Sequence, residues 1–235
     1  CPAKGDGPWN PIQGAKLLAL PASKNLVSVV YRDARFVVLD KPAGLAVHPG
    51  PGGGASVEDS FPLLSQRKDG PWLVHRLDAD TAGCLVIALR KAALLAAQAE
   101  FAGGRARKIY WAVVLGTPPG DHGVIDKPLL RRTSPEGWRI VVASDGQPAI
   151  TTWKILGQGG GGTWLELRPR TGRTHQIRVH LASIGCPILG DARYGGGDGP
   201  LHLLSRSIHL DLIPPLTATA EPPAALQPAL RALGW

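Results

Sequence analysis

The feature that most limits how this chain can fold is a series of short apolar runs separated by turns rich in glycine and proline. The runs are rich in β-branched and aromatic residues, which predicts β-strands. They lie at residues 26–31, 36–40, 72–77, 84–89, 108–116, 139–143, 149–156, 163–168 and 201–212. The regular strand–helix alternation of a doubly wound parallel sheet is absent. We therefore predict an α+β fold with a mixed, largely antiparallel sheet and flanking helices.

Three segments between these strands predict helices. Ser56 is a suitable N-cap for a helix over residues 56–64. Residues 91–101 are rich in Ala and Leu and precede two glycines, which commonly end helices. Residues 175–184 carry apolar side chains at i, i+4 and i+7, the spacing of one helix face.

The length of 235 residues allows one sizeable core or at most two small domains. Residues 1–25 contain several Gly and Pro residues and little periodicity, which indicates an irregular lead-in. No linker clearly divides the rest. We predict a single domain over residues 1–235, with its core at about residues 26–213.

The positive charge of the chain is concentrated in its middle third. The net charge is +8, and residues 101–180 alone carry 12 basic and 5 acidic residues, a net of +7. A localised basic excess suits a polyanion such as nucleic acid. A basic protein with a solvated cationic face is the other interpretation of the same charge.

Cysteine usage and hydropathy indicate the cellular compartment. The three cysteines are far apart and form no CxxC pair, so neither a disulfide framework nor a zinc knuckle is indicated. The longest apolar runs are too short to cross a bilayer. Residues 1–10 are polar and do not resemble a signal peptide. We expect a cytoplasmic protein with no membrane partner.

The segment Val74-His75-Arg76-Leu77-Asp78-Ala79-Asp80-Thr81-Ala82-Gly83 places a carboxylate just after an apolar strand. Strand ends that open into loops commonly present reactive groups. In an extended chain Arg76 and Asp78 share one face, so both could point into one cleft. A surface aspartate that caps a turn with Asp80 and Thr81 is the structural alternative.

Two further segments carry clustered donors. Lys108 and Tyr110 share one face of the strand at 108–116, and a cation beside an aromatic ring suits a phosphate next to a stacked base. The run from Arg168 to Leu181 holds many donors at a predicted helix start, where the backbone N–H groups also attract phosphate. Arg178 lies beside the apolar stripe, so a buried guanidinium with an acidic partner is expected.

Together these segments resemble the RluA-type RNA pseudouridine synthases. The resemblance rests on HRLD followed by DTAG, on KIYWAVVLG, on RTGRTHQIRVHLASIGCPILGDARYG and on the early KPAGLAVHPG, in order from about residue 26 to 213. It implies a pseudouridine synthase fold and one catalytic domain. Ala82 and Cys84 stand where the family often has Ser and Leu. No S4-like RNA-binding domain is evident, which leaves the RNA target open.

The resemblance implies a role for each matching residue. Asp78 matches the essential aspartate, and Tyr110 matches the tyrosine that stacks on the flipped uracil. Arg178 matches the arginine that pairs with the catalytic carboxylate, and we expect it to lower the pKa of Asp78. Arg76 matches the arginine that displaces and replaces the target base. The predicted RNA contacts are Arg76, Lys108, Arg173, Thr174, His175 and Ile177.

The implied reaction converts specific uridines of structured RNA, ribosomal or transfer, to pseudouridine through base flipping, glycosidic bond cleavage and reattachment at C5. It implies no cofactor, no metal and no obligate protein partner, and a monomer is favoured. A non-catalytic RNA-binding module is the alternative, although it would not need Asp78. A metal-dependent nuclease is disfavoured because His175 and His180 are five residues apart and so lie on different helix faces.

Overall fold

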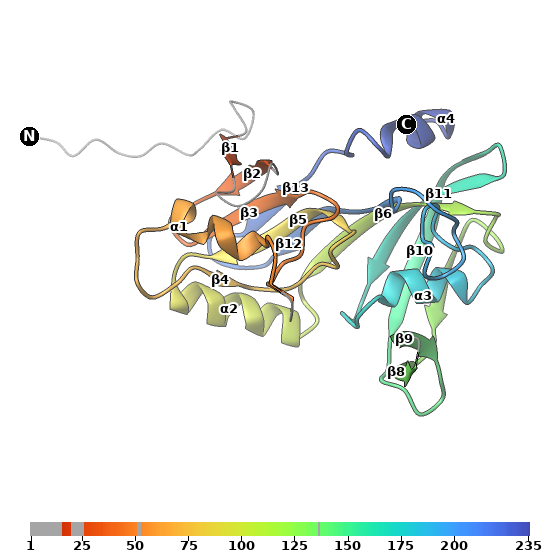
Figure 1. Cartoon of the computed structure of the whole chain (residues 1–235), viewed down its shortest axis with the longest axis horizontal. Coiled ribbons are helices and arrows are strands. Elements are labelled where there is room, and N and C mark those ends of the chain that lie inside the picture. Colours follow the sequence, from red (N-terminus) through yellow and green to blue (C-terminus); the bar gives the residue numbers. More distant parts are fainter. Residues whose placement is uncertain (1–15, 20–25, 51–52, 136) are drawn as a thin grey trace, which may run out of the picture.

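The computed structural model describes residues 16–19, 26–50, 53–135 and 137–235. Most of the predicted irregular lead-in therefore lies outside the described residues, apart from the strand β1 (Lys16–Ala19). Within the described ranges the predicted α+β class is confirmed: one large mixed sheet with few helices forms the body of the molecule (Figure 1).

The large sheet has eleven strands, nine of which follow the order β1-β2-β3-β5-β12-β6-β11-β10-β7. Neighbouring strands pair antiparallel except β5 and β12, which run parallel. The remaining strands β13 and β4 pair with β12 and β5. The strands are β2 (Leu26–Arg32), β3 (Phe36–Lys41), β4 (Trp72–Leu73), β5 (Ala82–Ala88), β6 (Arg107–Leu115), β7 (His122–Asp126), β10 (Ile150–Gly159), β11 (Gly162–Pro169), β12 (Leu203–Leu210) and β13 (Leu216–Thr219).

The helical segments cover the two faces of this sheet. On one face α2 (Lys91–Ala102) and α4 (Gln227–Ala232) share an apolar cluster with β5, β12 and β13. On the other face the 3-10 turn η1 (Val57–Ser60) and α1 (Phe61–Leu64) pack over β2, β3 and β5. Further along that face α3 (Gln176–Ala182) packs over β6 and β11. Tyr110 contacts both clusters of this second face, so it lies between them.

A separate hairpin of β8 (Leu129–Ser134) and β9 (Gly137–Val142) projects from the α3 side of the molecule (Figure 1). Arg139 and Arg193 tether it to the loop after α3, since each donates a hydrogen bond to a carbonyl across this junction. The sequence predicted β9 but not β8, β7 or β13. Exposed polar residues dominate β8 and β7, so neither has the apolar signal of a buried strand.

Two predicted elements are shorter than expected. The predicted strand at 72–77 ends at Leu73, because the His75 side chain takes a place in the sheet ladder: its Nε2 accepts the N–H of Val86 at 3.1 Å. Asp78 therefore lies within a loop and not directly after a strand. The predicted helix at 175–184 begins only at Gln176, because the backbone of His175 is left-handed. It ends at Ala182.

Gly83 of the DTAG segment fixes where this loop joins the sheet. Its φ is +106°, and an added Cβ would collide with the carbonyl oxygen of Ser205. The close approach matches the parallel pairing of β5 with β12, in which Gly83 lies opposite Ser205. A glycine is needed here for both reasons.

Candidate active site

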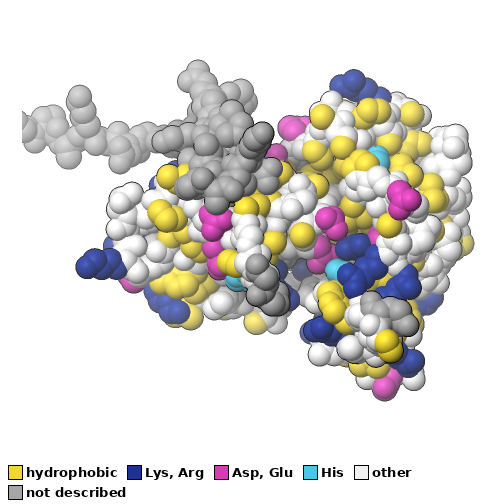
Figure 2. All heavy atoms as spheres, viewed as in Figure 1, with side chains coloured by type: hydrophobic (Ala, Val, Ile, Leu, Met, Phe, Trp, Pro, Cys, Tyr) yellow, Lys and Arg dark blue, Asp and Glu magenta, His cyan; other side chains and the backbone are white. Residues whose placement is uncertain are grey.

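A cleft of about 1230 Å³ opens on the sheet face that carries α1 and α3. Acidic, basic and histidine side chains gather in a hollow near the middle of the molecule (Figure 2). The predicted site residues that line the cleft are Arg76, Asp78, Lys108, Tyr110, Arg173, Thr174, His175 and Arg178. Ile177 lines a smaller adjoining pocket of about 90 Å³, together with Asp78, Tyr110 and Arg178. The fold thus brings together segments that lie 100 residues apart in the sequence.

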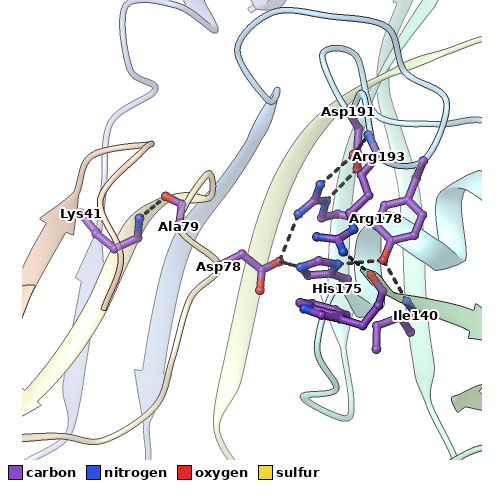
Figure 3. A network of polar contacts seen from close by, with 10 residues as sticks. Lys41, Asp78, Ala79, Ile140, His175, Arg178, Asp191 and Arg193 are labelled. Carbon is purple, nitrogen blue, oxygen red and sulfur yellow. Dashed lines mark hydrogen bonds and ion pairs between the residues drawn. The ribbon is translucent and has the colours of Figure 1, made fainter. Parts of the chain in front are cut away.

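The loop that carries Asp78 is held by its backbone. The N–H of Thr81 donates to the carbonyl of Asp78 at 3.1 Å, and the N–H of Gly44 donates to the carbonyl of Ala79 at 2.9 Å. The second bond ties the KPAG segment to the HRLD segment. The Asp78 side chain remains 27% exposed and points across the cleft toward α3 (Figure 3).

Lys41 is a residue of this site that the sequence interpretation missed. It is fully buried, and its Nζ donates to the carbonyls of Pro42, Leu45 and Ala79 at 2.7–2.9 Å. Burial lowers its pKa to about 8, against the opposing attraction of Asp80 and Asp78. The bond to Ala79 fixes the residue next to Asp78 (Figure 3). The only signal in the sequence was its place at the start of the KPAGLAVHPG segment, since the burial of Lys41 is seen only in the structure.

Arg178 has a second acidic partner that lies closer to it than Asp78 does. Its Nε and Nη2 donate to the two carboxylate oxygens of Asp191 at 2.8 and 2.7 Å, and both side chains are buried. Nη1 of Arg178 lies 3.8 Å from Oδ2 of Asp78, which is longer than a hydrogen bond. Arg178 therefore has a buried structural partner, Asp191, and faces Asp78 with its remaining nitrogen.

The pKa of Asp78 is raised and not lowered as expected. Burial is the largest cause, since it disfavours the charged carboxylate. The attraction of Arg178 opposes this effect, but repulsion from Asp80 adds to it. Arg178 thus acts on the pKa of Asp78 in the expected direction, but the effect of burial is larger.

Tyr110 forms part of the cleft floor below Asp78. Burial raises its pKa to about 12, so the phenol is neutral at physiological pH. The negative charge of Asp78 contributes to the same shift, and a hydrogen bond with Ser205 opposes it. A neutral ring on the floor of a cleft offers a flat surface for stacking.

The cleft wall near Tyr110 is basic. Lys108 donates to the carbonyl of Thr171 at 3.3 Å, and burial lowers its pKa. Arg173 is exposed and donates to the carbonyl of Pro148 at 3.2 Å. Both side chains thus present cations at the cleft, where the strand β6 meets the loop before α3.

Trp138 also lines the cleft, and two arginines stack on its ring. None of these residues was among the predicted site residues. The guanidinium of Arg193 lies 4.3 Å from the Trp138 ring centroid, and that of Arg131 lies 4.7 Å from it. Trp138 also lies near His175, with ring centroids 5.2 Å apart. Trp138 lies directly before the strand predicted at 139–143, and nothing in the sequence there indicated that it faces the cleft.

The described residues contain no group of three or more His, Cys, Asp or Glu side chains that could hold a metal ion. No helix in the described ranges is both long and apolar enough to cross a membrane.

A mixed sheet that places an aspartate, a tyrosine and basic side chains in one cleft suits an enzyme that acts on RNA. A model of the RNA pseudouridylate synthase family matches residues 35–183. The chain belongs to this family, and it is an RNA pseudouridine synthase, an isomerase. The predicted resemblance to the RluA type is thereby confirmed.

Individual relatives agree with this assignment. An uncharacterised RNA pseudouridine synthase of Zymomonas mobilis is 41% identical over 206 residues, which cover 84% of this chain and 94% of that protein. Ribosomal large subunit pseudouridine synthase C of Buchnera aphidicola is 37% identical over 78% of this chain, which spans 59% of that relative. The structure of human RNA pseudouridylate synthase domain containing 4 has a TM-score of 0.74 at 28% identity, covering 87% of this chain and 92% of that one.

Proposed function

We propose that Asp78 is the catalytic carboxylate with which this enzyme isomerises uridine in RNA. The observation that carries the proposal is its place: a partly exposed carboxylate over Tyr110, in a cleft whose wall is basic. Burial raises the pKa of Asp78, so its ionised form is held in a site that solvates it less well than water. Such a carboxylate suits nucleophilic or base catalysis.

The target uracil must leave the helical stack before its glycosidic bond can be reached. Unstacking costs a few kcal/mol. We assign the compensating contacts to Tyr110, on which the flipped base stacks, and to Arg76, which fills the vacated place. Base stacking on an aromatic side chain contributes about 1–3 kcal/mol.

Phosphate binding is assigned to the basic wall. Lys108, Arg173, Thr174 and His175 line the cleft together, and Ile177 forms part of the apolar pocket beneath. Cations along a groove attract the RNA backbone without reading its sequence. The positive charge of residues 101–180 is consistent with this assignment.

Two routes to bond cleavage remain open for Asp78. It can attack the sugar or the base as a nucleophile, or remove a proton at C2′ to give a glycal. In either case the N1–C1′ bond breaks, the uracil rotates and C5 bonds to C1′. C5 then loses its proton, N1 takes one up, and the Asp78 carboxylate is regenerated. Because the product is an isomer of the substrate, the reaction needs no redox centre and no phosphoryl donor.

The substrate is proposed to be a structured ribosomal or transfer RNA. The Buchnera relative is named for the large ribosomal subunit, which favours ribosomal RNA. We further propose that the enzyme acts in the cytoplasm as a monomer without an obligate protein partner, through a single catalytic domain.

Tritium release tests this function. RNA labelled with tritium at C5 of uridine should lose the label to water in the presence of the purified protein. The assay uses ribosomal RNA and transfer RNA pools prepared without endogenous pseudouridine, with chelator present throughout. Binding of RNA without any release would instead support the non-catalytic RNA-binding module.

A further inference from the structure

His175 has an unusual backbone for its position. Its φ of 52° and ψ of 19° make it the one non-glycine residue with positive φ in the described part of the chain. Histidine is among the residues that tolerate this region, but the conformation costs free energy and persists only where surroundings enforce it. Such outliers cluster at functional sites. The side chain is only 8% exposed and lies in the cleft.

The His175 ring is fixed by its neighbours. It packs near Trp138 and makes an edge contact with Tyr194, with ring centroids 5.6 Å apart. Nδ1 lies 2.8 Å from the Tyr194 hydroxyl, while Nε2 lies 3.9 Å from Oδ2 of Asp78 (Figure 3). One ring nitrogen therefore faces Tyr194 and the other faces the cleft.

The partners of Tyr194 determine which nitrogen carries the proton. The backbone N–H of Ile140 donates to the Tyr194 oxygen at 3.3 Å, which occupies one acceptor position and favours donation of the hydroxyl hydrogen to Nδ1 of His175. Burial, with repulsion from Arg178 and Arg193, lowers the pKa of His175 to about 4. The ring is then neutral at pH 7, with its N–H at Nε2. In the other neutral tautomer, which carries its proton on Nδ1, the lone pair of Nε2 would face the negatively charged carboxylate of Asp78.

Two donors approach the same oxygen of Asp78. Nη1 of Arg178 lies 3.8 Å from Oδ2, and Nε2 of His175 lies 3.9 Å from it. Oδ2 is the Asp78 oxygen that lies nearest to each of these two donors. The carboxylate thus has one oxygen directed at protein donors and one left for the substrate.

We propose that His175 is a positioning residue, whose Nε2–H, fixed by Tyr194, acts with Arg178 to hold Oδ2 of Asp78 so that Oδ1 faces the target uridine. This rests on the proposed role of Asp78. It also gives His175 a function beyond the RNA contact assigned to it above, because the imidazole acts on the reaction through the carboxylate.

The ring tautomer can be measured without RNA. In protein labelled with ¹⁵N-histidine at pH 7, His175 should show a protonated Nε2 and an unprotonated Nδ1; His175→Asn identifies its signals. Tyr194→Phe should shift the Nδ1 signal or mix the tautomers. Tyr31→Phe removes another hydroxyl, which bonds Asp33, and should leave the signals unchanged. A wild-type ring protonated at Nδ1 would overturn the proposal.

Kinetics distinguish positioning from a purely structural role. The side-chain amide of Gln is long enough to place an N–H donor where Nε2 of His175 lies. The shorter Asn amide reaches only the position of Nδ1. Asn, however, tolerates the left-handed backbone better. Positioning predicts that His175→Gln keeps a kcat roughly 10-fold or more above that of His175→Asn. A structural role predicts the reverse order, which would overturn the proposal.

Tyr194→Phe provides the second kinetic readout. It should lower kcat by roughly 10- to 100-fold, the usual effect of removing a group that orients an active-site ligand, and leave KM for RNA unchanged. Tyr31→Phe should have no effect. Unchanged kcat in Tyr194→Phe would contradict the proposal. If wild-type protein releases no tritium, the proposed function fails, but the tautomer still decides whether His175 is arranged as inferred.

Discussion

Two aspartates, Asp191 and Asp78, face Arg178, and they differ in their burial and in their distance from its guanidinium. The Asp191 side chain is fully buried and accepts two hydrogen bonds from the guanidinium, at 2.7 and 2.8 Å. The Asp78 side chain is 27% exposed and stays 3.8 Å from the same group. One carboxylate is fully paired with the arginine, while the other is only near it.

The comparison shows how a reactive carboxylate can be kept available beside a cation. A buried guanidinium without a partner is costly, so Arg178 needs a carboxylate that takes up its hydrogen bonds. Asp191 provides it. Asp78 is then attracted and oriented without being saturated, and burial still raises its pKa.

Removing the charge of Asp191, which pairs with Arg178, should have the largest effect on stability. Asp191→Asn leaves the Arg178 charge buried without its counterion, so the free energy of unfolding should fall by about 3–5 kcal/mol. Urea denaturation monitored by tryptophan fluorescence measures this. Asp69→Asn is the matched control, because it removes a solvent-exposed ion pair with Arg67 and should leave stability nearly unchanged. Equal losses in the two variants would contradict the comparison.

A second arginine, Arg173, can be compared with Arg178, whose charge is paired with Asp191. Arg173 is exposed and forms no ion pair with a described residue. Arg173→Gln should weaken RNA binding and reduce the slope of log affinity against log salt by about 1, as expected for one lost phosphate contact. Stability should not change. A slope equal to that of the wild type would remove Arg173 from the RNA interface.

The raised pKa of Asp78 predicts a pH dependence of stability. Below the ordinary value of 3.8 the group is protonated in both folded and unfolded states and contributes nothing. As pH rises through the raised folded pKa, the folded state must ionise a poorly solvated group and loses stability. Asp78→Asn lacks this loss, so its stability relative to wild type should grow from low pH toward neutrality. Denaturation at a series of pH values measures the difference, and a variant that becomes relatively less stable would contradict the raised pKa.

The smallest effect is expected for the Tyr110 hydroxyl. Tyr110→Phe keeps the ring on which the base is proposed to stack, so RNA affinity should be unchanged and the rate should fall by less than about 10-fold. Tyr110→Ala, the matched variant, loses stacking. A Phe variant as impaired as the Ala variant would show that the hydroxyl, and not the ring, matters beside Asp78.

Much of this arrangement could be predicted because local sequence determines it. The α2 helix was predicted at 91–101 and spans Lys91–Ala102, since its Ala- and Leu-rich run and the two glycines act within the segment. The grouping of Asp78, Tyr110 and Arg178 in one site was implied by the family resemblance and not by local sequence, and these residues line one pocket.

The remaining features depend on contacts that sequence spacing does not reveal. Asp191 pairs with Arg178 across a loop, and the prediction did not include it because it named only Asp78, which lies 3.8 Å from the guanidinium. The His75 side chain, and not a strand backbone, accepts the hydrogen bond from the N–H of Val86 in β5. No periodicity in the sequence indicates this contact. Lys41 and Tyr194 act through bonds to the carbonyl of Ala79 and the ring of His175, both far away in the sequence.

The most direct test of the central claim is tritium release by Asp78→Asn, measured with enzyme in excess over C5-labelled RNA so that a single turnover suffices. The account predicts no release above background, with the fold and RNA affinity of the wild type, while Asp69→Asn releases tritium normally. Release by Asp78→Asn at a rate near that of the wild type would show that another group starts the reaction.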